Sequence, residues 1–261
     1  MLLNLVYSEV DYTNWVLRFT ITVKDPDIKA SREVIEAHAK SEIKAIKYNS
    51  HETVNQYIQK DAKLLQKFLF QALKIIEVDR RYLSDGSAIY EYEIPLTGDV
   101  LKLLVPPRQP IEYLVPMVCP CCKQTWPENF PVPNGVKLLP SENENCPKYT
   151  GFVIDARNIP LDFALFPKVI NEDGREVFSI NYADPSYVVN SGLVKYLPES
   201  AQLLLTEFCG NNPLWITALR SSGFNNVDIV ISNKTARILH SSLSNLELLE
   251  KCRVAVLYRE K

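Results

Sequence analysis

The stretch that decides the fold is Tyr149–Ser179, with the sequence YTGFVIDARNIPLDFALFPKVINEDGREVFS. Its first eight residues, 149–156, are rich in β-branched and aromatic side chains, which predicts a β-strand. Successive side chains of a strand point to opposite faces, so Phe152 and Ile154 are expected on one face and Val153 on the other. The rest of the chain is expected to be organised around this strand.

A second strand is expected after a loop in the same stretch. The run FALFPKVI at 163–170 is rich in apolar and aromatic residues. Pro167 predicts an edge or a bulge there, because proline donates no hydrogen bond to a ladder. The pair Asp173-Gly174 is a strong turn signal, so residues 163–180 are expected to form a β-hairpin.

Asp155 and Arg157 lie where the first strand meets its loop. A catalytic role would make Asp155 a general base at the end of a strand. The structural alternative is an aspartate that accepts local backbone N–H bonds, with the arginine bridging nearby. The structural role is favoured, because no His, Cys or Ser partner lies near these residues in the sequence.

Length and composition exclude several classes of function. The chain has 261 residues, of which 46% are hydrophobic and 23% are charged, and its formal net charge is −2. No basic field favours nucleic acid or an anionic membrane surface as a partner. No run approaches the ~20 apolar residues that a transmembrane helix needs. Two modest globular domains are expected.

Strand and helix signals predict the first domain. The expected elements are two extended runs at 10–23, helices at 28–48 and about 52–73, a β-hairpin at 73–96 and a short helix at 99–104. This order predicts an α+β domain at 1–105, in which a helix pair covers one face of a small antiparallel sheet.

Four polar side chains of this domain are candidates for chemistry. His38 and His51 are expected in core or cap positions rather than as metal ligands or bases, because neither has a carboxylate or cysteine at ligand spacing. Glu91 and Glu93 lie on the same face of one expected strand and could act as a carboxylate pair. Simple solvation of both is the alternative.

Residues 106–148 are expected to be a linker rich in proline and cysteine. Eleven of the 17 prolines lie between Pro95 and Pro147, which excludes a helix or a central strand. The same segment holds four cysteines, Cys119, Cys121, Cys122 and Cys146. Cys119 and Cys122 have the CxxC spacing of half a zinc knuckle. Zinc binding and disulfide pairing are both expected to fit these four cysteines, and free thiols are the third alternative.

The segment 149–261 predicts a mixed α/β domain. Its expected elements are the strand and hairpin described above, a helix at 199–208 ended by Gly210, strands at 213–219 and 227–232, a helix from Ser232 or Asn233 to His240, a helical turn at 246–249 and a closing strand at 253–258. Cys252 opens the closing strand and is expected to be a buried structural thiol.

Three patterns in the decisive stretch resemble one known family. These are YTG-FVI-DAR at 149–157, AL-F-PK-V at 164–169 and EDG-R-EV-F at 172–178. They look like the C-terminal region of a bacterial envelope protein family whose N-terminal domain is of the Lpp-twenty lipoprotein type. That domain is similar to the N-terminal domain of the flagellar assembly protein T.

The N-terminal half resembles the same family at three places. These are VDYTNWVLR at 10–18, the expected helix pair, and RRYLSDG followed by YEYEIPLTGDV at 80–100. The resemblance implies the fold of that family and an association with the periplasm or outer membrane. Two departures are a first cysteine only at Cys119, which leaves no lipid-attachment residue near the start, and Asn158-Ile159-Pro160 where a glycine-bearing loop is expected. We expect that the sequence begins inside or just after an export signal; a cytoplasmic location is the alternative.

The resemblance and the missing motifs together set the order of the functional hypotheses. The sequence contains no GxSxG, P-loop, GxGxxG or HExxH motif. The leading hypothesis is a non-enzymatic envelope protein that acts through self-association or by binding an envelope or flagellar partner, without nucleic acid. The alternative is a small zinc-binding module that uses the linker cysteines. An enzyme based on Asp155 and Arg157 is the third hypothesis.

Overall fold

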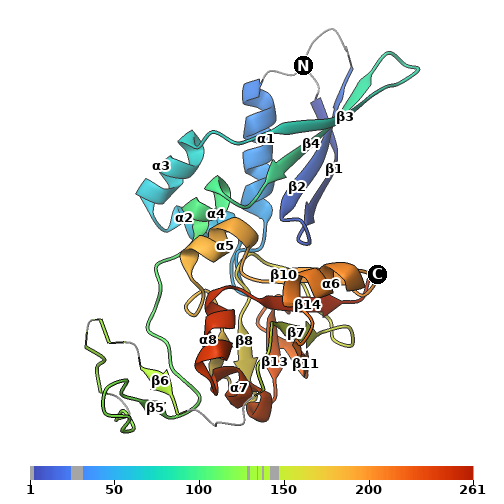
Figure 1. The fold of residues 1–261 in the computed structure, drawn as a ribbon. Helices are drawn as coiled ribbons and strands as arrows, with labels where there is room; N and C mark the ends of the chain where they lie inside the picture. Colours follow the sequence, from blue (N-terminus) through green and yellow to red (C-terminus); the bar gives the residue numbers. More distant parts are fainter. Residues whose placement is uncertain are drawn as a thin grey trace.

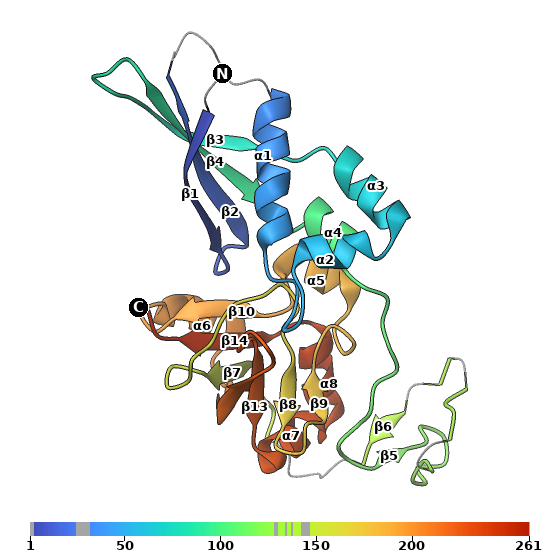
Figure 2. The same cartoon turned by 180° about the vertical axis from the view of Figure 1, so that it is seen from behind.

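The structure of the chain is a computed structural model, and it describes residues 3–24, 32–127, 130–133, 135–136, 138–141 and 147–260. Helices and sheets are mixed in an α+β fold with two domains. Figures 1 and 2 show the N-terminal domain above the C-terminal domain, with a small two-stranded ribbon apart from both. The fold class and the two-domain organisation predicted from the sequence are confirmed.

One antiparallel sheet with the strand order β1-β2-β4-β3 builds the N-terminal domain. Its strands are β1 (Leu3–Asp11), β2 (Val16–Val23), β3 (Ile76–Tyr82) and β4 (Ala88–Pro95). Alternate residues of β2 and β4 are buried, among them Phe19 and Tyr92, whose rings are 5.5 Å apart. The helix α1 (Arg32–Ala45) lies along this buried face (Figure 1), so the predicted hairpin at 73–96 and the helix-on-sheet layering are found.

The predicted second helix at 52–73 is wrong as a single element. The chain forms α2 (Val54–Gln59) and then α3 (Ala62–Phe70). The break lies at Asp61, whose side chain accepts the backbone N–H of Lys63 at 2.8 Å and so caps a new helix. The short helix predicted at 99–104 is confirmed as α4 (Asp99–Leu104).

Two sheets build the C-terminal domain. The first is parallel, with the order β10-β14-β7-β11, and consists of β7 (Phe152–Asp155), β10 (Lys195–Pro198), β11 (Leu214–Thr217) and β14 (Val254–Tyr258). The second is mixed, with the order β12-β13-β8-β9, and consists of β8 (Val169–Asn171), β9 (Glu176–Phe178), β12 (Arg220–Ser222) and β13 (Asp228–Ile231).

Helices pack around these two sheets (Figure 2). They are α5 (Pro185–Ser191), α6 (Gln202–Cys209), α7 (Asn233–His240) and α8 (Leu243–Glu250). The cap predicted for α7 is Ser232, which accepts the N–H of Thr235 at 3.1 Å. Over the ranges that the structure describes, no helix is long and apolar enough to cross a membrane.

The strand β7 lies in the middle of the parallel sheet, between β14 and β11. Phe152, Val153 and Ile154 are all fully buried, because both faces of a parallel sheet are covered. The predicted closing strand is β14, which has a parallel neighbour on each side. Cys252 just before it is 1% exposed, and burial raises the pKa of its thiol to about 12, so the prediction of a buried structural cysteine is confirmed.

The hairpin predicted at 163–180 is confirmed only in its second part. The strands β8 and β9 pair in antiparallel fashion around the Asp173-Gly174 turn. The first strand begins after Pro167 rather than at Phe163. Residues 165 and 166 instead donate their N–H groups to the N-terminal domain, which Pro167 cannot do because it has no N–H.

The start of the predicted linker is attached to the C-terminal domain. Residues 106–115, called the strap below, contact this domain through several hydrogen bonds. The backbone N–H of Gln109 donates to Asn181 Oδ1 at 2.9 Å, and the Tyr182 hydroxyl donates to the Glu112 carbonyl at 2.6 Å. The strap leads to the ribbon of β5 (Met117–Val118) and β6 (Leu139–Pro140), which lies apart from both domains in both views (Figures 1 and 2).

Backbone hydrogen bonds and aromatic packing join the two domains. Leu165 and Phe166 donate their N–H groups to the carbonyls of Lys47 and Tyr48 at 3.0 and 2.9 Å. In the β1–β2 turn, the Trp15 side chain is only 2% exposed. A Cβ atom on Gly192 would lie 2.0 Å from Trp15 Cε2, so only glycine leaves room for this ring.

Comparing Gly192→Ala with Gly174→Ala should separate the cost of backbone strain from the cost of a clash with the Trp15 ring. Gly192 and Gly174 have similar φ values of +81° and +78°, but a Cβ on Gly174 would meet no atom within 4 Å. We expect Gly174→Ala to lower the free energy of unfolding by about 1 kcal/mol and Gly192→Ala by about 3 kcal/mol or more. Urea denaturation of both variants checks this, and equal losses would show that Trp15 does not constrain the join.

Candidate functional site

Asp155 and Arg157 form a closed ion pair at the carboxyl end of β7. The guanidinium donates from Nε to Oδ1 at 2.9 Å and from Nη2 to Oδ2 at 2.7 Å, and the Arg157 backbone N–H also donates to Oδ1. These hydrogen bonds, chiefly the side-chain one from Arg157, lower the pKa of the Asp155 carboxyl. A carboxylate with a lowered pKa and occupied oxygens is a weak base, which is the structural arrangement favoured from the sequence.

The two histidines singled out in the sequence do not lie together. His38 packs against the Phe19 ring at 5.7 Å between centroids, and its Nε2 lies 4.0 Å from Glu42. The expectation that no carboxylate stands at ligand spacing was wrong for His38, because Glu42 follows it by one helical turn. His51 lies on an exposed loop, where its backbone N–H donates to Asn49 Oδ1.

Glu91 and Glu93 are not a free carboxylate pair. Glu93 accepts a hydrogen bond from Arg18 Nε at 2.7 Å, directly across the β2–β4 pairing. Arg18 also lies 3.3 Å from Asp11 on β1. The charges on this face of the sheet therefore link three strands.

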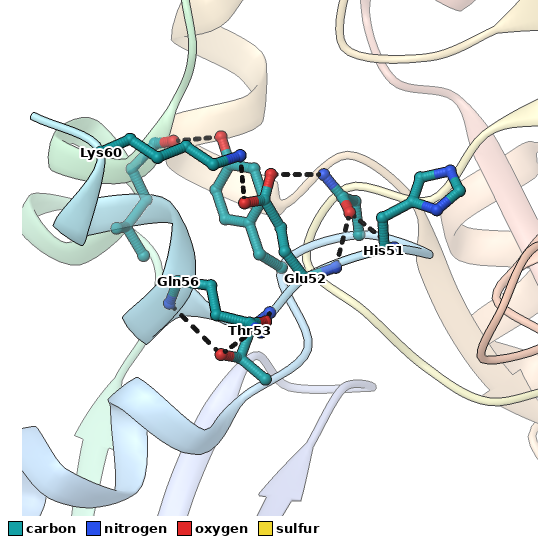
Figure 3. A network of polar contacts seen from close by, with 8 residues as sticks. His51, Glu52, Thr53, Gln56 and Lys60 are labelled. Atoms are coloured by element: carbon teal, nitrogen blue, oxygen red, sulfur yellow. Dashed lines mark hydrogen bonds and ion pairs between the residues drawn. The ribbon is translucent and has the colours of Figure 1, made fainter.

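A polar network surrounds the loop that carries His51 (Figure 3). Glu52 lies 2.5 Å from Lys60 Nζ and accepts from the side chain of Asn49, while the His51 ring points away from both. The Glu52 carbonyl accepts the N–H of Tyr48, the residue whose own carbonyl binds Phe166 of the C-terminal domain. The network therefore positions the domain join rather than a reacting group.

His240 is a buried titratable residue that the sequence did not single out. Its ring is fully buried between the strap and β9. Nδ1 accepts the backbone N–H of Leu114 at 3.1 Å, so the neutral ring must carry its proton on Nε2, which donates to the Val177 carbonyl at 2.8 Å. Burial lowers the pKa of His240 to about 4.

Three of the four linker cysteines lie in the turn that follows β5. Cys119 is half-buried, Cys121 and Cys122 are exposed, and all three are free thiols. Cys146 lies outside the described residues. Within the described part of the chain, no group of three or more His, Cys, Asp or Glu side chains converges as a metal site. The predicted set of Cys119, Cys121, Cys122 and Cys146 stays a prediction.

The strand β3 forms an open edge of the N-terminal sheet. All seven of its residues are exposed, whereas every second residue of its neighbour β4 is buried. Three of the exposed side chains are apolar or aromatic, with exposed fractions of 37% for Ile76, 45% for Val78 and 65% for Tyr82. The sequence alternation at 73–83 did not predict that both faces of this strand would be exposed.

A cavity of about 310 Å³ lies where the α3–β3 connection meets α4 and α5. Its lining includes Lys74, Thr97, Asp99 and Asn190, and contains no histidine, cysteine or serine. It therefore presents no histidine base and no cysteine or serine nucleophile.

Comparison with known families gives one match. Residues 151–260 match a family model described as the second domain of Treponema pallidum Tp0624. The match covers the C-terminal domain, from the strand before the Asp155 loop to the closing strand. No curated protein matches the chain. The resemblance of both halves of the chain to the family with the Lpp-twenty-type domain stays a prediction.

The buried His240 should make stability depend on pH. Between pH 6.5 and about 4 the unfolded chain protonates this histidine and the folded chain does not. Above pH 6.5 the protonation of His240 therefore does not reduce the free energy of unfolding. As the pH drops to about 4, this group lowers the free energy of unfolding by about 3 kcal/mol. We expect His240→Gln to remove this dependence of the free energy of unfolding on pH. The exposed control His51→Gln should leave it unchanged. Urea unfolding at several pH values measures both, and identical slopes in all three proteins would contradict the assignment.

Proposed function

We propose that the protein is non-enzymatic and acts by assembly, through pairing of two copies along the open edge strand β3. The observation that carries this proposal is that β3 ends the strand order of its sheet, with β4 as its one strand neighbour and all seven of its residues exposed. The compartment that we propose is the bacterial cell envelope, at the periplasmic side or the outer membrane, and it rests on the resemblance to the Lpp-twenty and flagellar assembly proteins alone. An association with the flagellum rests on the same resemblance.

An edge strand presents a row of unpaired backbone groups to any other strand. Most proteins blunt such edges with short strands, bulges, charges or a covering helix. β3 is seven residues long and carries one register shift, near Val78. Beyond this shift the run Asp79–Tyr82 is regular, so a strand can pair along it.

The charges of β3 favour a second copy as the partner. Glu77 and Asp79 lie in its first half, and Arg80 and Arg81 in its second half. In the single chain Arg80 pairs with Glu77 at 2.6 Å and Arg81 with Asp79 at 3.2 Å, so these arginines exchange partners when two copies pair. When two copies of such a strand pair in antiparallel fashion, the acidic half of each lies opposite the basic half of the other. The contact is then isologous, with the same surface used on both copies. Parallel pairing would place like charges together.

The opposite edge of the same sheet lacks this complementarity. The strand β1 carries Glu9 and Asp11 near its end, and Asp11 is already paired with Arg18. Residues 7–11 of β1 contain no basic side chain. Two copies joined through this part of β1 in antiparallel fashion would therefore gain no opposite-charge pairs.

Charge reversal on β3 tests the proposal. We expect the wild-type protein to be a dimer in sedimentation analysis. The double variants Glu77→Lys with Asp79→Lys, and Arg80→Glu with Arg81→Glu, should each weaken that dimer by about tenfold or more, because each replaces attraction by repulsion. An equimolar mixture of the two double variants should form a heterodimer, since one strand is then basic and the other acidic.

The matched control is Glu247→Lys, which removes an exposed ion pair with Lys251 on α8, far from β3 in the chain. It should leave the dimer unchanged. A wild-type protein that remains monomeric up to its solubility limit would overturn the proposal. A dimer that survives both double reversals would place the contact elsewhere.

A further inference from the structure

The tip of the ribbon has the backbone geometry of a metal-binding knuckle. Residues 119–123, called the cysteine turn here, reverse the chain between Val118 and Thr125, which form a bridge. The Cys119 N–H donates to the Gln124 carbonyl at 2.9 Å, and the Lys123 N–H donates to the Cys119 carbonyl at 2.9 Å. Cys119 and Cys122 therefore lie in the same tight turn of the chain.

Lys123 adopts a left-handed conformation with a φ of +60°. This region suits glycine and costs other residues of order 1 kcal/mol, so it persists where the surroundings require it. Here it follows the second cysteine of the CxxC pair directly. The strained residue closes the turn that sets the spacing of the two thiols.

The backbone N–H groups of Cys121 and Cys122 face the Cys119 sulfur. Donors of this kind offset the negative charge that a sulfur carries when it binds a metal ion.

The ribbon has little apolar core of its own. Its two strands are two residues each, and Met117, Leu138 and Pro140 are its buried apolar side chains among the described residues at 116–141. Units of this size are stabilised by disulfides or by a bound metal more often than by packing. A metal at the cysteine turn would supply the missing free energy of folding.

We propose that the cysteine turn binds Zn²⁺, with Cys119 and Cys122 as the two anchoring thiolate ligands. Zinc prefers tetrahedral coordination by soft sulfur ligands at CxxC spacing. Binding displaces the thiol protons to solvent, and no electron transfer is involved. Of the remaining coordination positions, one is open to Cys121 on the same turn. This site is independent of the pairing proposed for β3.

Metal content and cobalt spectra of the full chain test the proposal. The protein is purified anaerobically under reducing conditions, and bound zinc is measured by elemental mass spectrometry. We expect about one zinc per chain in the wild type and a loss of affinity on the order of a hundredfold in Cys119→Ser and in Cys122→Ser. Replacement by Co²⁺ should give thiolate-to-cobalt charge-transfer absorption that both variants reduce.

Lys123→Gly is the matched control, because it keeps all thiols and relieves the left-handed strain. It should bind zinc at least as tightly as the wild type. Two results would overturn the proposal. One is a wild-type protein without zinc after reconstitution, with masses that show disulfides or fully protonated thiols. The other is zinc retained with unchanged affinity in both serine variants. Charge reversal on β3 should leave the zinc content unchanged, so the two proposals fail separately.

Discussion

The insertion of Trp15 beside Gly192 is the constraint on which the relation of the two domains depends. The ring occupies the place that a side chain at position 192 would fill. Its backbone carbonyl accepts the N–H of Leu96 at 2.8 Å, which ties the β1–β2 turn to the end of β4. Beside it, the Thr13 hydroxyl donates to the Tyr196 carbonyl at 2.8 Å. The N-terminal sheet is thereby fixed on the C-terminal domain by packing, so the linker does not have to set their orientation.

This fixed join leaves two parts of the chain outside the shared core. One is the edge strand β3, which the helices of the N-terminal domain do not cover. The other is the cysteine ribbon beyond the strap. Burial of the Leu114–His240 hydrogen bond attaches the strap firmly, so the ribbon leaves the surface at a defined place. The proposed pairing surface on β3 and the proposed zinc site are therefore carried by elements that the core does not require. Binding surfaces are usually found on such elements.

Local signals in the sequence predicted many elements well, because their causes lie within a few residues. Ser232 caps α7 with its own side chain, Gly210 ends α6 at a positive φ, and Asp173-Gly174 closes the β8–β9 hairpin. The error at Asp61 has the same kind of cause: a side chain that can accept a backbone N–H began a second helix inside an apolar periodic run. The ion pair of Asp155 with Arg157, two residues apart, was likewise predictable.

The sequence by itself determined the α+β class, the order of most elements, the CxxC spacing and the charge pattern of β3. The tertiary structure alone decided which residues are buried and which surfaces stay open. His240 becomes a buried neutral base only because Leu114, 126 positions away, donates to its ring. β3 is an open edge because β4 is its one strand neighbour. Its side chains stay exposed although its alternation resembles that of the buried strand β4. Burial depends on contacts between distant segments, and periodicity within one segment carries no record of them.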